Sequence, residues 1–261
     1  MSADAPIGVF DSGIGGLSVL RALRAALPGE DFVYLADTAH APYGERGDAF
    51  VADRSLAVAR QLHDRHGIKA MVVACNTATA AAIAPLRQAW PALPLVGVEP
   101  ALKPAAAQTR TGRVGVMATR GTLGSTRFRA LRESLAHRVT YVQQPCDGLA
   151  EAVEQDDAMK IIALCSVYTG AMGRFGIQNG DIDTLVLGCT HYPFATGVLR
   201  GLVGPEVQLV ETGEPVARQT QRLLSNAGLL CGRPRGRHSL LATGPSEGLQ
   251  AAAARWLPPQ A

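Results

Sequence analysis

Lysine, aromatic residues and surplus charge of either sign are all scarce in this 261-residue chain. Only three of its 25 basic residues are lysines, aromatic residues make up 5%, and the formal net charge is +3. The arginines are scattered, with no long basic run. Because a nucleic-acid surface needs concentrated positive charge, we expect no nucleic-acid partner.

Long apolar runs are also absent, since no window approaches 18 uninterrupted apolar residues. We therefore expect no membrane-spanning helix. The first ten residues contain no basic segment that leads into a long apolar stretch, so we expect no secretory signal and a cytoplasmic location. A content of 47% hydrophobic residues and 18% charged residues is typical of a folded globular chain.

Cysteine occurs five times, without a single C-x-x-C pair. Structural zinc sites use short paired spacings, so we expect no metal. A disulfide framework is not expected in a cytoplasmic protein. Each cysteine is therefore either a small buried apolar residue or a reactive thiol.

Short apolar runs alternate with stretches of helical periodicity. Uninterrupted apolar runs are typical of parallel strands covered by helices on both faces. The strands are expected at 7–10, 32–36, 71–74, 94–98, 114–117, 139–142, 185–187, 207–210 and 239–242. This alternation predicts the α/β class.

Two stretches of the chain look like copies of each other. Residues 7–13 resemble residues 114–120, and later in each half an apolar strand ends next to a cysteine. We therefore predict two pseudo-symmetric α/β domains, each a mostly parallel sheet flanked by helices, with the active site in the cleft between them. The first domain would comprise 1–98 plus 208–261 and the second 99–207, with residues 99–108 as a proline-containing linker.

Cys75 and Cys189 are the two cysteines at the expected carboxyl ends of strands, where open α/β sheets bind ligands. A helix that begins there would favour the thiolate. A buried packing role is the alternative for each cysteine. Two such thiols in matching contexts suit a racemase, in which one group removes an α-proton and the other returns one to the opposite face.

The α-proton of an amino acid is very weakly acidic, and pyridoxal phosphate bound to a lysine is one solution. None of the three lysines lies in a recognisable cofactor motif, and Lys69, Lys103 and Lys160 each fit an exposed position. The sequence therefore favours a route without a cofactor, in which positioned hydrogen-bond donors stabilise a carbanionic transition state.

Five segments carry a resemblance to a known family: IGVFDSGIGGLSVL (7–20), YLADTAHAPYGERG (34–47), VVACNTATA (72–80), GVMATRGTLGS (115–125) and LVLGCTHYPF (185–194). In this order they resemble the glutamate racemases, which are cofactor-independent two-cysteine enzymes of the aspartate/glutamate racemase superfamily. The resemblance implies interconversion of L-glutamate and D-glutamate, with D-glutamate supplied for peptidoglycan. A homodimer is one arrangement it allows.

The resemblance also implies site residues. Cys75 would deprotonate D-glutamate and Cys189 would deprotonate L-glutamate. Asp11 would assist Cys75, and His191 would assist Cys189 with support from Glu154, for which Glu151 is the alternative carboxylate. The substrate-binding residues would be Ser12, Tyr43, Gly44, Asn76, Thr77, Thr119, Thr122 and Thr190.

Each of these residues also has a structural interpretation. Asp11 can be a helix N-cap, His191 a ring that is hydrogen-bonded to backbone, and Tyr43-Gly44 an ordinary turn. Three other functions compete with glutamate racemisation. They are a racemase for aspartate or a hydantoin, a dinucleotide-binding protein that uses Gly13–Gly16 and Asp37, and a catalytically silent binding protein.

Overall fold

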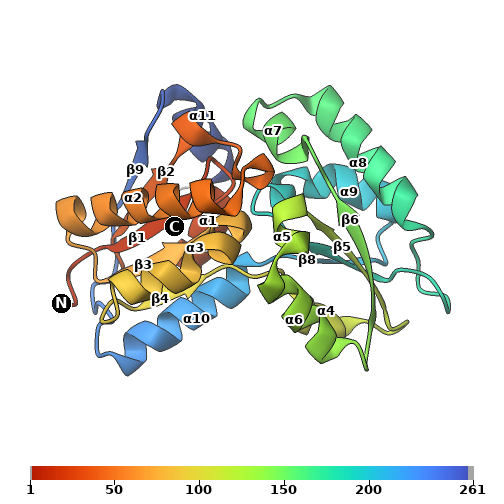
Figure 1. The fold of residues 1–261 in the computed structure, drawn as a ribbon, viewed down its shortest axis with the longest axis horizontal. Helices are drawn as coiled ribbons and strands as arrows, with labels where there is room; N and C mark the ends of the chain where they lie inside the picture. The colour runs from red at the N-terminus through yellow and green to blue at the C-terminus, as the bar shows by residue number, and fades with distance from the viewer. Residues whose placement is uncertain (1, 258–261) are drawn as a thin grey trace. The chain divides into compact units, whose positions relative to one another are not determined.

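The computed structural model describes residues 2–257, which form two compact units. The first unit takes in the chain up to Val98 and again from Gly213, and the second unit is Glu99–Thr212. Each unit is an α/β layer structure with its own parallel sheet (Figure 1). The two-unit α/β prediction is thus confirmed at the level of the sheets.

The sheet of the first unit has five strands in the order β4-β3-β1-β2-β9, and every neighbouring pair is parallel. The central strands are buried along their whole length, because helices cover both faces of the sheet. The strands are β1 (Ile7–Asp11), β2 (Phe32–Ala36), β3 (Ala70–Val73), β4 (Leu95–Gly97) and β9 (His238–Ala242).

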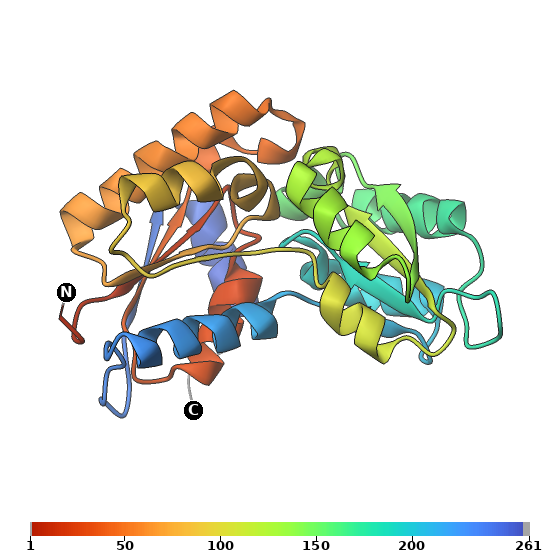
Figure 2. The same ribbon diagram turned by 60° about the horizontal axis from the view of Figure 1, so that its bottom comes forward.

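The helices of the first unit lie on two sides of this sheet. Figure 2 shows α2 and α3 on one side of the sheet and α1 and α10 on the other. Apolar side chains from α2 and α3 share one buried cluster with alternate residues of β1, β2 and β3. The helices are α1 (Leu17–Ala26), α2 (Asp48–His66), α3 (Asn76–Ala89), α10 (Gly213–Asn226) and α11 (Glu247–Trp256), with the short turns η1 (Thr38–His40) and η2 (Tyr43–Glu45).

The second unit has a four-stranded parallel sheet in the order β6-β5-β7-β8. Its strands are β5 (Arg113–Ala118), β6 (Thr140–Pro145), β7 (Thr184–Leu187) and β8 (Gln208–Val210). Two separate buried clusters cover the two faces, one with α7, α8 and α9 and one with α4 and α6. The helices are α4 (Leu102–Gln108), α5 (Arg120–Gly124), α6 (Thr126–Leu135), α7 (Leu149–Glu154), α8 (Ala158–Met172) and α9 (Thr196–Val203), with η3 (Tyr192–Ala195).

The internal repeat is visible in the topology. When the second sheet is written as β8-β7-β5-β6, it has the same order as β4-β3-β1-β2. The first residue of β3 that pairs with β1 is Ala70, and the first residue of β7 that pairs with β5 is Thr184. Cys75 and Cys189 each lie five residues after these first paired residues, so the two thiols occupy equivalent positions.

Two predicted boundaries differ from the structure. The return to the first unit falls after Thr212 and not at 208, because β8 pairs in parallel with β7 and belongs to the second sheet. The predicted linker at 99–108 contains helix α4, whose residues Leu102 and Ala105 are buried in the second unit. Pro104 fits there because it lies in the first turn, where its missing N–H costs no helical hydrogen bond.

The expected exposure of Lys69 is wrong. Its side chain is fully buried at the beginning of β3, and its ammonium lies 2.5 Å from the buried carboxylate of Glu30. The paired opposite charge makes that burial tolerable. Within residues 2–257, no helix combines the length and the apolar character that a bilayer crossing requires.

Candidate active site

Each sheet has a point where the strand order reverses, between β1 and β3 in one unit and between β5 and β7 in the other. Ligands of open α/β sheets bind beyond the carboxyl ends of the strands at such a point. Asp11 ends β1 and Cys75 follows β3, whereas Thr119 follows β5 and Cys189 follows β7. The topology therefore brings each cysteine to the binding edge of its own sheet.

Cys75 is the N-cap of α3. Its Sγ accepts a hydrogen bond from the backbone N–H of Ala78 at 3.4 Å, and it lies 3.7 Å from Oγ of Ser12. The side chain is buried, with 5% exposure. A thiolate at this position is stabilised by the free N–H groups and the positive end of the helix dipole. The predicted helix start after Cys75 is confirmed.

Asp11, the last residue of β1, is linked to this thiol through Ser12. Oδ1 of the buried Asp11 accepts a hydrogen bond from the Gly13 N–H at 2.8 Å and lies 3.5 Å from the Ser12 hydroxyl. Helix α1 begins after Gly16, so Asp11 is not its N-cap. Gly16 is required here, because a Cβ would lie 2.6 Å from Cβ of Asp11 and 2.8 Å from the Tyr34 hydroxyl.

Asn76 follows Cys75 with a buried side chain whose amide is unsatisfied. Its exposure is 4%, and within the described residues neither Nδ2 nor Oδ1 has a hydrogen-bond partner. Buried amides without partners are rare, since each one loses its hydration without compensation. Both groups are therefore available to a bound polar ligand beside the thiol. Thr77, the next residue, is also buried.

Tyr43 packs in the same buried cluster as Cys75, but its hydroxyl is already committed. The hydroxyl donates to Oδ2 of Asp37 at 2.6 Å, and burial together with this carboxylate raises the pKa of Tyr43. Asp37 also accepts hydrogen bonds from Arg54 and Thr243. Sequence reasoning missed these last two residues, because Thr243 lies 206 positions from Asp37.

In the second unit, a chain of three groups begins at Cys189. Its Sγ lies 3.6 Å from Nδ1 of His191, and Nε2 of that ring lies 2.6 Å from Oε1 of Glu154. Both Cys189 and His191 are buried. The alternative carboxylate Glu151 is directed elsewhere and bonds the Lys160 ammonium at 3.0 Å. The structure thus brings Glu154, and not Glu151, to the histidine.

The charge of His191 follows from these contacts. Burial lowers the pKa of the imidazole, but its hydrogen bonds with Cys189 and Glu154 outweigh burial and raise the pKa well above the usual 6.5. These contacts favour the imidazolium form of the ring. An imidazolium beside Cys189 stabilises the thiolate and can hold a proton close to it. The interpretation of His191 as a ring bonded only to backbone does not match these contacts.

Three threonines complete the edge of the second sheet. The Thr119 hydroxyl caps α5 by accepting from the Thr122 N–H at 3.2 Å and donates to the Thr122 hydroxyl at 3.0 Å. Thr122 and Thr190 are buried. Gly188 lets β7 close against β5, because a Cβ there would lie 2.8 Å from the Met117 carbonyl oxygen. The Gly188 N–H donates to that carbonyl at 2.7 Å, so the chain just before Cys189 lies against the end of β5.

Of the other cysteines, Cys146 directly follows β6 at the same carboxyl edge as Cys189, whereas Cys165 lies within α8. Burial raises the pKa of Cys165 to about 11 and also raises that of Cys146, so both thiols stay protonated in the core of the second unit. Cys231 is half-buried and lies 3.0 Å from Nε of Arg233. Within the described residues, no three His, Cys, Asp or Glu side chains gather as metal ligands do.

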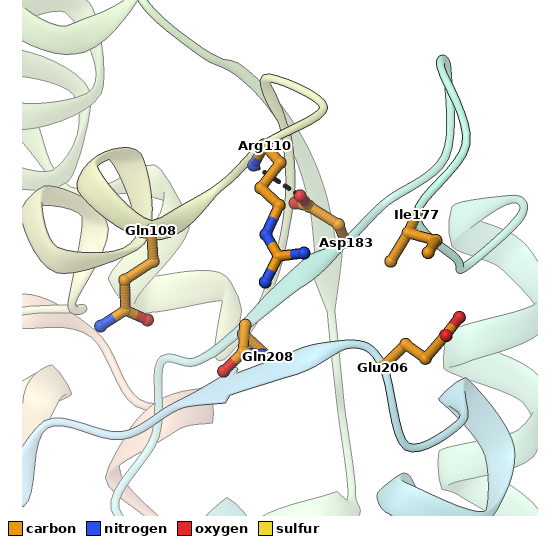
Figure 3. A pocket seen from close by; sticks show the side chains of 6 residues that line it. All are labelled: Gln108, Arg110, Ile177, Asp183, Glu206 and Gln208. Carbon is orange, nitrogen blue, oxygen red and sulfur yellow. Dashed lines mark hydrogen bonds between the residues drawn. The ribbon is translucent and has the colours of Figure 1, made fainter.

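One open cavity of about 230 Å³ lies in the second unit, at the opposite edge of its sheet from Cys189 (Figure 3). Asp183 lies there, just before β7, and Gln208 begins β8, so this is the edge where the strands start. The Asp183 carboxylate accepts from the backbone N–H of Arg110 at 2.6 Å and from the Thr109 hydroxyl at 2.6 Å. These bonds hold the residues that follow α4 against the start of β7.

Comparisons with known proteins agree on a single family. A family model described as Asp/Glu/Hydantoin racemase matches residues 7–220. A glutamate racemase of Pseudomonas syringae pv. tomato is 51% identical over 233 residues, which cover 88% of this chain and 82% of that protein. Two similar crystal structures carry ligands. Glutamate racemase of Francisella tularensis in complex with D-glutamate has a TM-score of 0.82 at 25% identity, covering 98% of this chain and 94% of that one. The Escherichia coli enzyme in complex with L-glutamate and the activator UDP-MurNAc-Ala has a TM-score of 0.80 at 30% identity, covering 97% and 95%.

Proposed function

Because this chain belongs to the Asp/Glu/hydantoin racemase family, we propose that it racemises glutamate with Cys75 and Cys189 as the two acid–base groups. Its activity is that of a glutamate racemase, an isomerase, as in relatives that share half of its residues over most of its length. The family role that follows is provision of D-glutamate for peptidoglycan. We place this role in the cytoplasm.

The equivalence of the two thiols is the observation that carries the proposal. They stand at the same register position of two sheets with the same strand order, each beyond the switch point of its own sheet. Each also has a group beside it that stabilises a thiolate, namely the α3 N-terminus for Cys75 and the His191 imidazolium for Cys189. A single strand-end cysteine would be explained equally well by packing.

In the proposed racemisation, one proton leaves the α-carbon and another returns to it from the opposite face. The Cys75 thiolate takes the α-proton of D-glutamate, which leaves the electron pair on the α-carbon delocalised into the carboxylate. The Cys189 thiol then donates a proton to the opposite face of that carbon, and L-glutamate is formed. Cys75 is now a thiol and Cys189 a thiolate, which is the state that accepts L-glutamate for the reverse reaction. No electron is transferred, and both thiols exchange protons with water between turnovers.

The remaining residues serve binding and proton placement. Asp11 assists Cys75, and His191 with Glu154 assists Cys189. Donors for the two carboxylates are the amide N–H of Asn76, the backbone N–H groups at the start of α3 and around Gly44, and the hydroxyls of Ser12, Thr77, Thr119, Thr122 and Thr190. The amide oxygen of Asn76 and the hydroxyl oxygens can accept from the substrate ammonium. The same donors stabilise the charge that develops on the α-carboxylate in the transition state.

A time course of circular dichroism with purified protein and L-glutamate, without added cofactor, tests the function. The signal should decay to zero, and in deuterated water the product should carry deuterium at the α-carbon. L-Aspartate and D-aspartate are assayed alongside, because the family also contains aspartate and hydantoin racemases. A stable L-glutamate signal, or product that keeps all of its original hydrogen, contradicts the proposal.

A further inference from the structure

Asp37 is the centre of a buried hydrogen-bond cluster at the end of β2. Its side chain is fully buried, yet four side chains bond to its carboxylate. The Tyr43 hydroxyl donates at 2.6 Å, Arg54 donates through Nε at 3.0 Å and Nη2 at 2.9 Å, and Thr243 donates at 2.7 Å. His40 Nδ1 lies 3.0 Å from the same carboxylate.

This cluster joins the segment after β2 and helix α2 to Thr243, which lies 206 positions from Asp37. Tyr43 lies in η2, in the loop that follows β2, whereas Arg54 projects from α2. Thr243 follows β9, the edge strand that the end of the chain adds beside β2. The Thr243 hydroxyl also accepts from the backbone N–H of Ala39 at 3.2 Å. A single hydroxyl therefore bridges the backbone of the loop and the Asp37 carboxylate.

The carboxylate stays ionised in this setting. Burial alone would raise the pKa of Asp37, but the hydrogen bonds from Arg54, Tyr43 and Thr243 outweigh burial and lower it. Charge-assisted bonds of this kind are among the stronger ones in proteins. Three donors that converge on one fixed anion hold the loop in one position more firmly than a surface turn would be held.

The cluster also determines what Tyr43 offers to a ligand. Its side chain is 1% exposed, and its hydroxyl proton is committed to Asp37. The ring therefore anchors the loop and does not donate to substrate. What this loop can present beside Cys75 is backbone, at Tyr43 and at the half-exposed Gly44. Backbone donors bind well only when the backbone is held in place.

We propose that Asp37, Arg54 and Thr243 are positioning residues that fix the Tyr43-Gly44 backbone for binding of the glutamate carboxylate. This inference rests on the proposed function, since it assigns these residues to the same binding site. It also gives the last strand of the chain a part in substrate binding, through one hydroxyl. None of the three residues touches the reacting atoms.

A binding role has a distinct kinetic signature. Loosening the loop weakens substrate in the ground state and in the transition state alike, which raises KM and leaves kcat nearly unchanged. The loss of a proton-transfer group would instead lower kcat. The two enantiomers have equal free energies in water, so kcat/KM must fall by the same factor in both directions for any variant.

Thr243→Val is the sharpest test, because it keeps the shape of the side chain and removes both bonds of the hydroxyl. We expect KM for L-glutamate and for D-glutamate to rise about tenfold, the ratio that corresponds to ~1.4 kcal/mol, with kcat within about twofold of the original. Thr243→Ser keeps the hydroxyl and restores KM. The control is Thr220→Val, which removes a buried hydroxyl that donates to the Val216 carbonyl within α10.

Glutamate binding by calorimetry and thermal unfolding accompany the kinetics. A tenfold weaker Kd in Thr243→Val but not in Thr220→Val supports the inference, even if turnover is undetectable. An unchanged Kd and KM in a folded Thr243→Val protein overturns it, as does a loss confined to kcat or a failure of Thr243→Ser to restore KM. If the unsubstituted chain binds glutamate without racemising it, the proposed function fails separately.

Discussion

Replacement of Glu154 by Gln tests how the second proton-transfer group is tuned. The carboxylate lies 2.6 Å from Nε2 of His191, with the histidine side chain 6% exposed and the glutamate side chain 20% exposed. Gln keeps nearly the same volume and a hydrogen-bonding oxygen but removes the negative charge. The substitution therefore changes the electrostatics of the histidine with little change in packing.

The size of the expected loss in kcat/KM follows from the energy of the hydrogen bond between His191 and Glu154. A hydrogen bond to a charged partner contributes about 1.5–3 kcal/mol, and 1.36 kcal/mol corresponds to one pKa unit. The pKa of His191, which this carboxylate helps to hold well above 6.5, should therefore fall in Glu154→Gln. In the proposed mechanism the imidazolium is the active form, so the alkaline limb of the kcat/KM profile should move to lower pH. Above that limb, kcat/KM falls about 10- to 100-fold.

The assay is kcat/KM against pH between 6 and 10, measured in both directions by circular dichroism. Glu151→Gln is the matched control, because that carboxylate is on the same helix but bonds Lys160 at 3.0 Å near the surface. The control should keep the original profile. A Glu154→Gln protein whose alkaline limb does not move would refute the assignment of this carboxylate to the histidine.

Three further predictions concern other parts of the chain. Cys75→Ala and Cys189→Ala should each abolish racemisation while glutamate still binds by calorimetry, and near-full turnover by either variant would disprove the two-base assignment. Gly16→Ala should destabilise the fold by about 1–3 kcal/mol in urea unfolding, because its Cβ meets atoms at 2.6 Å and 2.8 Å, whereas Gly201→Ala, with open space around it in α9, should be neutral or stabilising. Burial raises the pKa of Asp183, but its four hydrogen bonds outweigh burial and lower the pKa below 3.8. The ionised carboxylate therefore stabilises the folded state fully above pH 3.8. This stabilisation is lost as the pH falls through the pKa of the folded state. Asp183→Asn should therefore cost about 1–3 kcal/mol at pH 7 and progressively less below pH 4, and a difference that does not vary with pH would contradict this.

The strands of both sheets could be predicted from the sequence, because a buried parallel strand is a short, uninterrupted run of apolar residues. Runs such as 71–74 are apolar on both faces, which is typical of a strand between helices. The same signal located both cysteines, since each follows such a run. It was weaker for β8, where Gln208 and Leu209 are not fully buried, and the assignment of this strand to a unit depended on a pairing with β7 that no local pattern encodes.

The contacts that tune the site were harder to find, because they join distant residues. Glu154 meets His191 across 37 positions, and Thr243 meets Asp37 across 206. The resemblance to a known family supplied the first contact and gave no sign of the second. The burial of Lys69 could not be predicted for the same reason, since residue type alone predicts an exposed lysine and only the pairing with Glu30 explains full burial.

The two thiols occupy equivalent positions but do not have equivalent surroundings, and this has a kinetic consequence. A backbone N–H and a serine hydroxyl lie beside Cys75, whereas an imidazolium with its own carboxylate lies beside Cys189. In the proposed mechanism, unlike surroundings should make the enzyme form that accepts D-glutamate and the form that accepts L-glutamate unequally populated. The two directions must have equal kcat/KM. Unequal populations of the two enzyme forms can therefore appear only as a kcat and a KM that differ between D-glutamate and L-glutamate by the same factor. Glu154→Gln, which weakens the support of one thiolate alone, should change that factor, and an identical ratio before and after the substitution would show that the two half-sites do not act independently.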